Sequence, residues 1–175
     1  MSVRLESNSI RMRFVEEKDA EFILTLRLDP KYNSYISKVN DDVVEQRAWI
    51  SKYKLLENNK SEFYFIIERL DGTPCGTVRV YDLTQDSFCW GSWILNENKT
   101  RYSAIESAML VYEFGFAYLG FKKSHFDVMK ENQSVINFHK KFGAEIVGED
   151  HNNFYFEITE NKVEITRANL HRLLK

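Results

Sequence analysis

The chain has 175 residues, of which 43% are hydrophobic and 14% aromatic, and this favours one packed globular domain over a disordered segment. Its 24 basic and 26 acidic residues give a formal net charge of −2, without the basic excess typical of proteins that bulk charge holds to nucleic acid. Two cysteines, Cys75 in a predicted turn and Cys89 in a predicted strand, are too few for a disulfide framework or a four-cysteine zinc site.

No apolar run approaches the roughly 18–20 residues of a membrane span, and segment 1–14 lacks the apolar core of a signal peptide. The four histidines are scattered and form no metal-binding spacing. We therefore expect a soluble, cytoplasmic protein with reduced cysteines and no metal, and with neither nucleic acid nor a membrane as its partner.

The first third of the chain predicts one strand and two helices. Residues 10–15 alternate apolar and basic side chains with the period of a half-buried strand. Acidic residues then open a helical pattern over 16–28, which Pro30 ends. A second helical pattern, with its apolar residues on one face, predicts a helix over 41–56.

The middle of the chain has the composition of strands. Segments 63–67, 77–83 and 88–95 are rich in β-branched and aromatic residues, and Asp71-Gly72 between the first two is a hairpin turn signal. We expect these segments to form an antiparallel meander at the centre of the domain.

The longest helical pattern covers 105–119, carries one continuous apolar stripe and ends at Gly120, where a C-terminal cap belongs. The remaining expected elements are a strand over 124–129, a short helix over 135–142 closed by Gly143, and a hairpin made of 144–147 and 154–158.

The elements follow the order β-α-α-β-β-β-α-β-α-β-β, without internal repeats. This order predicts a single α/β (α+β) domain over residues 1–160, with a mixed, mostly antiparallel sheet of about seven strands flanked by about four helices. Residues 161–175 form a C-terminal tail whose weak helical periodicity does not place it.

The turn before the long helix, residues 96–104, is a candidate phosphate site. A helix N-terminus offers free backbone N–H groups and a partial positive charge. Lys99 and Arg101 would add ionic contacts, and Ser103 a hydroxyl. The alternative is an ordinary solvated loop with two basic residues.

Segment 131–144, ENQSVINFHKKFGA, has Asn132 at its second position, where it would open a short helix, and ends with Lys-Phe-Gly-Ala. This pattern resembles the terminal motif of the GCN5-related N-acetyltransferase (GNAT) superfamily, which reads roughly ENxxxxxxYxKxGF. The ending FxxLGF of the long helix (116–121) matches the usual end of the family's corresponding helix. The resemblance covers roughly residues 10–158 and is strongest from Ser92 to Gly143.

The resemblance implies a GNAT fold that uses acetyl-CoA as co-substrate, without a metal. Lys99 matches the first position of the family's acetyl-CoA loop, Q/R-x-x-G-x-G/A, and Ala104 its last position. The implied coenzyme contacts are the backbone of Trp93, Ile94 and Leu95 for the pantetheine arm, the turn of Lys99, Thr100, Arg101, Tyr102, Ser103 and Ala104 for the pyrophosphate, and Asn132 and Asn137 in the later helix.

Two positions of this loop depart from the family pattern. Tyr102 and Thr100 stand where the family frequently has glycine. Glycine allows the backbone to approach the pyrophosphate without an intervening Cβ. A shifted loop, weaker coenzyme binding or loss of catalysis would each be consistent with these substitutions.

The family mechanism is direct attack of an acceptor amine on the thioester, without a covalent enzyme intermediate. His139 stands where many members have the tyrosine that protonates the leaving thiolate, and histidine can donate a proton near neutral pH. A packing role for His139 is the alternative, as helix capping is for Asn132. No residue is diagnostic of the general base.

The acceptor region of the family corresponds to the first two helices, the loop between them and the last hairpin, here roughly residues 27–42 and 150–154. Segment LRLDPKYNSYIS (26–37) resembles both enzymes that acetylate protein N-termini and enzymes that acetylate nucleotide-linked amino sugars. We favour a small-molecule amine, namely a nucleotide-linked amino sugar, with Arg27, Tyr32 and Tyr35 at the substrate. Protein N-termini, polyamines, aminoglycosides and a non-catalytic binding module are the alternatives, and the resemblance allows a homodimer.

Overall fold

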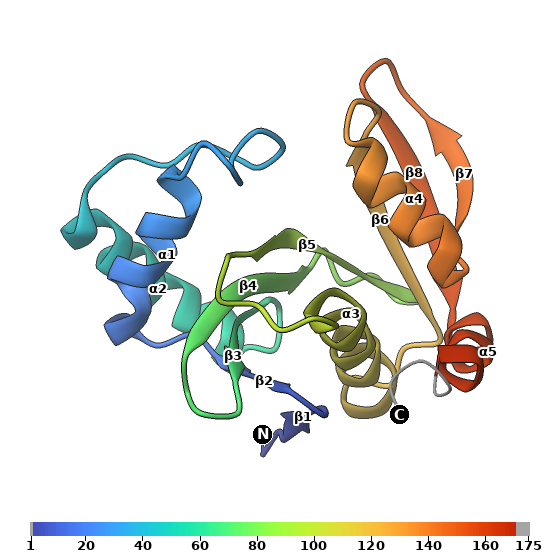
Figure 1. The fold of residues 1–175 in the computed structure, drawn as a ribbon, viewed down its shortest axis with the longest axis horizontal. Coiled ribbons are helices and arrows are strands. Elements are labelled where there is room, and N and C mark those ends of the chain that lie inside the picture. Colours follow the sequence, from blue (N-terminus) through green and yellow to red (C-terminus); the bar gives the residue numbers. More distant parts are fainter. Residues whose placement is uncertain (1, 171–175) are drawn as a thin grey trace.

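The computed structural model describes residues 2–170 as one open sheet with helices on both of its faces (Figure 1). Within these residues the sheet has eight strands in the order β1-β2-β3-β4-β5-β6-β8-β7, and all neighbours are antiparallel except β5 and β6. The strands are β1 (Leu5–Glu6), β2 (Ile10–Phe14), β3 (Phe63–Arg69), β4 (Pro74–Tyr81), β5 (Ser87–Leu95), β6 (Lys123–Met129), β7 (Glu145–Glu149) and β8 (Asn153–Thr159).

The predicted mixed, mostly antiparallel sheet is thus confirmed, with one more strand than expected. Strand β1 has only two residues, too few to show a period in the sequence. Cys75, expected in a turn, is instead buried in β4.

The helices are α1 (Ala20–Leu28), α2 (Val43–Asn58), α3 (Ser103–Glu113), α4 (Gln133–Phe142) and α5 (Glu160–Leu170). A short 3₁₀ turn (Glu17–Asp19) precedes α1, and α3 continues as a π turn (Phe114–Tyr118).

Strand β3 lies inside the sheet between β2 and β4, and its side chains from Phe63 to Glu68 are buried on both faces. Phe63 and Phe65 belong to the large core that includes α3, whereas Tyr64 and Ile66 belong to a smaller core with α1 and α2. A strand covered on both sides needs apolar or aromatic side chains at every position, which explains the unbroken FYFII run.

The unplaced tail forms α5 as far as Leu170, and the remainder of the tail lies outside the described residues. Val163 of this helix is fully buried in the large core, and the Thr166 hydroxyl donates a hydrogen bond to the Phe142 carbonyl at the end of α4. Both contacts attach α5 to the same packed unit as the sheet.

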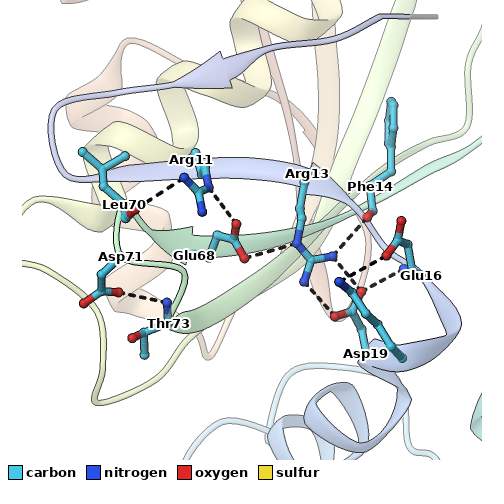
Figure 2. A network of polar contacts seen from close by, with 10 residues as sticks. Arg11, Arg13, Phe14, Glu16, Asp19, Glu68, Leu70, Asp71 and Thr73 are labelled. Atoms are coloured by element: carbon cyan, nitrogen blue, oxygen red, sulfur yellow. Dashed lines mark hydrogen bonds and ion pairs between the residues drawn. The ribbon is translucent and has the colours of Figure 1, made fainter.

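The start of α1 is fixed to the sheet by two buried carboxylates and two partly exposed arginines (Figure 2). Arg13 of β2 donates to both carboxylate oxygens of Asp19 at 2.8 Å and to Glu68 of β3 at 3.1 Å. Arg11 donates to the other oxygen of Glu68 at 2.7 Å. Buried carboxylates held by arginine are costly to break apart. The cluster therefore sets where α1, and Arg27 near its end, lies over the sheet.

A candidate coenzyme cleft and an arginine-lined cavity

Strands β5 and β6 diverge after a short paired stretch (Figure 1). The parallel ladder joins only Ser87–Cys89 with Lys123–His125, after which β6 continues against β8 and β5 against β4. Within the described residues, the edge of β5 that faces β6 is unpaired from Trp90 to Leu95. Unpaired N–H and C=O groups of this kind can pair with an added extended chain. The predicted coenzyme residues Trp93, Ile94 and Leu95 lie on this edge.

A β-bulge marks the middle of the open edge. Thr77 of β4 pairs with Ile94, but Arg79 pairs with Gly91, so β5 carries one extra residue between these pairs. Ser92 lies in the bulge with a φ of +49°, a left-handed conformation that is uncommon outside glycine. Bulges redirect backbone groups and often lie next to active sites. This bulge lies in the part of β5 that is not paired with β6, so it changes the direction of the backbone groups that face the cleft.

The turn that follows β5 is fixed by a directed chain of hydrogen bonds. Glu106 of α3 is only 2% exposed, and its carboxylate accepts from Ser9 N–H at 2.9 Å and from Ser9 Oγ at 2.6 Å. Because Ser9 donates to this carboxylate, Thr100 Oγ1 must donate to Ser9 at 2.6 Å, and Ser103 Oγ must donate to Thr100 at 2.7 Å. Ser103 in turn accepts from the Thr100 N–H at 2.8 Å. Aligned hydroxyls of this kind strengthen one another.

This network explains how the turn does without glycine. Thr100 directs its hydroxyl into the protein, and Tyr102 has an ordinary φ of −111°. Neither residue is among the non-glycine positions with positive φ, so the substitutions impose no backbone strain. Ser103, predicted to offer a hydroxyl to phosphate, is fully buried and uses that hydroxyl within the network.

The N-terminus of α3 nevertheless keeps the features of an anion site. Among the residues described by the structure, the N–H groups of Ala104 and Ile105 make no hydrogen bond. Lys99 and Arg101 are exposed beside them, and the Arg101 guanidinium lies 5.2 Å from the ring centre of Tyr102. Free amides with flanking cations can bind phosphate groups.

His139, the predicted proton donor, lies in an aromatic cage. Its ring centre is 4.3 Å from that of Phe126, 5.4 Å from that of Trp90 and 5.8 Å from that of Phe156. The residue is 4% exposed, and its Nδ1 atom has no hydrogen-bond partner. Burial lowers the pKa of His139 to about 3, so the ring is uncharged at neutral pH. These surroundings do not support a proton-donating imidazolium, and the catalytic role of His139 stays a prediction.

The buried ring makes stability depend on pH. An unfolded histidine titrates near pH 6.5, whereas His139 in the folded chain takes up a proton only near pH 3. Between these values the unfolded state binds more protons, so the free energy of unfolding falls as the pH falls. We expect the wild type to lose about 2 kcal/mol more than His139→Phe between pH 7 and pH 5. Urea unfolding at both pH values measures this, and equal losses would mean that the folded ring is protonated.

The other predicted coenzyme residues lie on α4. Asn132 precedes the helix, but its side chain makes no capping hydrogen bond and its Oδ1 accepts only a long 3.5 Å contact from Ser134. The capping alternative is therefore wrong, and the amide of Asn132 is half-buried without a strong partner. Asn137 is exposed on the same helix.

Two of the predicted substrate residues connect the loop between α1 and α2 to both arms of the cleft. The Tyr32 hydroxyl donates to Glu97, just after β5, at 3.0 Å. The Tyr35 hydroxyl donates at 3.4 Å to the carbonyl of Glu131, just after β6. The loop therefore contacts both strand ends at the open end of the cleft, and in Figure 1 it is drawn above β5, on the α1 side. Arg27, the third predicted substrate residue, is buried at the end of α1.

A cavity of about 400 Å³ lies between this loop, α2 and the sheet. Sequence reasoning missed its sheet side, where Tyr64 and Arg79 are paired neighbours on β3 and β4. A basic residue inside the apolar TVRVY run was the available signal. The cavity is lined by Arg27, Ser37, Lys38, Val39, Asn40, Glu45, Gln46, Trp49, Tyr64 and Arg79.

The two cysteines have no arrangement suited to nucleophilic attack. Burial raises the pKa of Cys75 to about 11 and that of Cys89 to about 12, so both thiols are protonated at neutral pH.

Within residues 2–170, no group of three or more His, Cys, Asp or Glu side chains is arranged to hold a metal ion. None of the described helices is both long and apolar enough to cross a membrane.

Comparison with solved structures identifies relatives of this fold. A structure described as apo FdhC, a nucleotide-linked sugar GNAT, is 50% identical with a TM-score of 0.92, and the alignment covers all of both chains. The ribosomal-protein-S5-alanine acetyltransferase from Vibrio fischeri is 13% identical with a TM-score of 0.78, over 91% of this chain and 98% of that one.

Spermidine N-acetyltransferase from Vibrio cholerae, solved with CoA and spermine, is 17% identical with a TM-score of 0.75, over 89% of this chain and 98% of that one. The latter two relatives share the fold. No curated protein matches the sequence. The family model for the acetyltransferase (GNAT) domain matches residues 9–145. The chain therefore belongs to the GNAT family of N-acetyltransferases and is an acyltransferase by class.

Proposed function

We propose that this protein transfers the acetyl group of acetyl-CoA to a primary amine of a nucleotide-linked amino sugar. The observation that carries the proposal is the 50% identity, over the whole of both chains, to a nucleotide-linked sugar GNAT. Identity of 50% over a full domain supports a common substrate class more strongly than the 13–17% identity of the relatives that share only the fold.

The site residues support coenzyme binding in a consistent way. The open edge of β5 would pair with the pantetheine arm through the backbone of Trp93–Leu95. This edge leads to the N-terminus of α3, where free amides, Lys99 and Arg101 would hold the pyrophosphate. When bound, acetyl-CoA supplies an activated thioester whose carbonyl carbon is open to attack by an amine.

The remaining chemistry falls to the bulge and the acceptor side. Backbone N–H groups near Leu95 would stabilise the oxyanion that forms as the amine attacks. Tyr32 and Tyr35 would close the loop over the bound reactants, because their hydroxyls already contact both arms of the cleft. A closed loop excludes water, which would otherwise compete with the amine for the thioester.

Thermal unfolding with and without ligand tests coenzyme binding first. Acetyl-CoA or CoA at 100 times its dissociation constant should add about 2.7 kcal/mol of stability and raise Tm by several degrees, whereas NAD should not. Release of the CoA thiol is then followed with nucleotide-linked amino sugars, spermidine and an N-terminal peptide as acceptors.

The outcomes separate the alternatives. Turnover with the nucleotide-linked sugars alone supports the proposal, and turnover only with spermidine or the peptide would replace the acceptor. A folded protein whose Tm does not change with millimolar acetyl-CoA would favour the non-catalytic binding module.

A further inference from the structure

The cavity beneath the loop between α1 and α2 contains a buried cation that no carboxylate neutralises. Arg27 is 7% exposed, and in the described part of the chain it hydrogen-bonds only to Ser37, through Nη2 to the carbonyl at 2.9 Å and to Oγ at 2.6 Å. No described acidic group lies within ion-pair distance of it. A buried charge without a partner is costly, so its retention points to a function.

A second arginine lies on the floor of the same cavity in a fixed position. The guanidinium of Arg79 lies 4.9 Å from the ring centre of Tyr81, 5.8 Å from that of Trp49 and 5.9 Å from that of Tyr64. It forms an ion pair with Glu62, while its Nε has no partner. Burial and the nearby positive charge of Arg27 both lower the pKa of Arg79, which indicates electrostatic repulsion between the two guanidinium groups. An anion bound near both would relieve this repulsion.

The cavity also contains a polar group that needs a partner. The Tyr64 hydroxyl lines the cavity, the residue is 1% exposed, and its oxygen has no hydrogen-bond partner. The lining includes three basic residues, Arg27, Arg79 and the outer Lys38, against one carboxylate, Glu45, which Asn40 contacts at 3.2 Å. The balance of charge and the unpaired donors favour an anionic ligand rich in hydrogen-bond acceptors.

Strand register connects the cavity to the coenzyme cleft. Arg79 pairs with Gly91 of β5, the residue before the bulge at Ser92. Neighbouring strands are about 4.8 Å apart, so the cavity floor lies roughly 10 Å from the position that an extended chain would take along the open edge of β5. A ligand bound there could extend one further group to the reacting carbonyl.

We propose that this cavity is a diphosphate-binding site, in which Arg27 is the principal contact and Arg79, Lys38 and the Tyr64 hydroxyl complete the set of donors. The cavity would bind the diphosphate group of a nucleoside diphosphate. This assignment rests on the proposed function, because the nucleotide-linked sugar is the expected source of that diphosphate. The volume of about 400 Å³ is within the range of small-ligand pockets and too large for a carboxylate alone.

Titration calorimetry on CoA-saturated protein tests the site, because CoA then occupies the other place where a diphosphate can bind. The probes are uridine diphosphate, thymidine diphosphate, inorganic pyrophosphate and uridine. We expect both nucleoside diphosphates to bind, pyrophosphate to bind more weakly and uridine not to bind. Arg27→Gln should weaken nucleoside diphosphate binding about 10- to 100-fold, and Arg27→Lys by less.

The matched control is Arg47→Gln, which removes the same charge from an exposed position on α2 outside the cavity lining. It should leave nucleoside diphosphate binding unchanged. The CoA affinity of each variant reports its folding. If Arg27→Gln loses CoA binding, Tyr64→Phe carries the test, since it removes only one buried hydroxyl and should weaken nucleoside diphosphate binding several-fold.

Three results would overturn the inference while leaving the acetyltransferase proposal intact. The first is wild-type protein that binds CoA but neither nucleoside diphosphate. The second is nucleoside diphosphate binding that is equal in wild type, Arg27→Gln and Tyr64→Phe. The third is uridine binding as tight as that of the nucleoside diphosphates. If CoA itself fails to bind, the proposed function fails, and the same titrations without CoA still decide the cavity.

Discussion

Gly115→Ala is expected to destabilise the protein by about 3 kcal/mol, because the site has no room for a methyl group. A Cβ at Gly115 would lie 2.0–2.6 Å from three ring atoms of Phe88, far inside van der Waals contact. Phe88 is fully buried in β5, opposite Ser124, where β5 and β6 are still paired. Displacing its ring would disturb the closed end of the coenzyme cleft as well as the core.

Denaturant unfolding followed by circular dichroism measures this loss. Gly148→Ala serves as the control, since its Cβ would meet only Tyr155 at an ordinary 3.5 Å, and it should change stability by less than about 0.5 kcal/mol. Adding Phe88→Leu to Gly115→Ala should recover part of the loss, a positive coupling between the two sites. Equal stability of Gly115→Ala and wild type would mean that the π turn shifts to make room.

Elements with long, regular patterns were predictable from the sequence. The stripe over 105–119, the FYFII run and the glycine stops at Gly120 and Gly143 all correspond to observed elements, and both glycines have positive φ. Local side-chain period and turn chemistry determine such elements. The π turn at the end of α3 has no signal in the apolar stripe, and the close approach of Gly115 within it to Phe88 of β5 is a contact between residues far apart in the sequence.

Only the parts of the candidate site that are formed by backbone groups were predictable. The helix N-terminus after β5 follows from the local sequence pattern, and the use of the β5 edge was implied by the resemblance to the GNAT family. The cavity was not predictable, because Tyr64 and Arg79 meet through the register of two strands and Trp49 joins them from α2. The reason that Thr100 and Tyr102 are tolerated was equally hidden, because the partner of Thr100 is Ser9, far away in the sequence.

In the proposed function, the two sides of the sheet would have separate roles that meet at β5. The candidate coenzyme cleft lies along the edge of β5 and the start of α3, while the arginine-lined cavity opens on the face covered by α1 and α2. The bulge at Ser92 joins them, since Gly91 pairs with Arg79 and Ile94 with Thr77. An acceptor and a coenzyme that approach from these two directions would meet at the bulge without competing for space.

Glu106→Leu is expected to reduce both stability and acetyl-CoA affinity. It removes the acceptor at the end of the hydroxyl chain, so the Ser9 N–H and the Ser9 O–H hydrogen lose the carboxylate to which they donate, at a cost of about 3 kcal/mol. Thr100 and Ser103 would then lose the alignment that fixes the turn, so fewer molecules would hold the binding-competent turn. The acetyl-CoA dissociation constant should rise about tenfold, in proportion to that loss.

Two further variants separate loop positioning from general stability. Glu113→Leu, on the same helix at a residue whose side chain has no hydrogen-bond or ion-pair partner among the described residues, should change affinity little. Thr100→Val removes only the middle hydroxyl, yet it should weaken acetyl-CoA binding almost as much as Glu106→Leu, because a directed chain fails at any break. If Thr100→Val binds acetyl-CoA like wild type while Glu106→Leu is only less stable, the network supports the fold and does not position the turn.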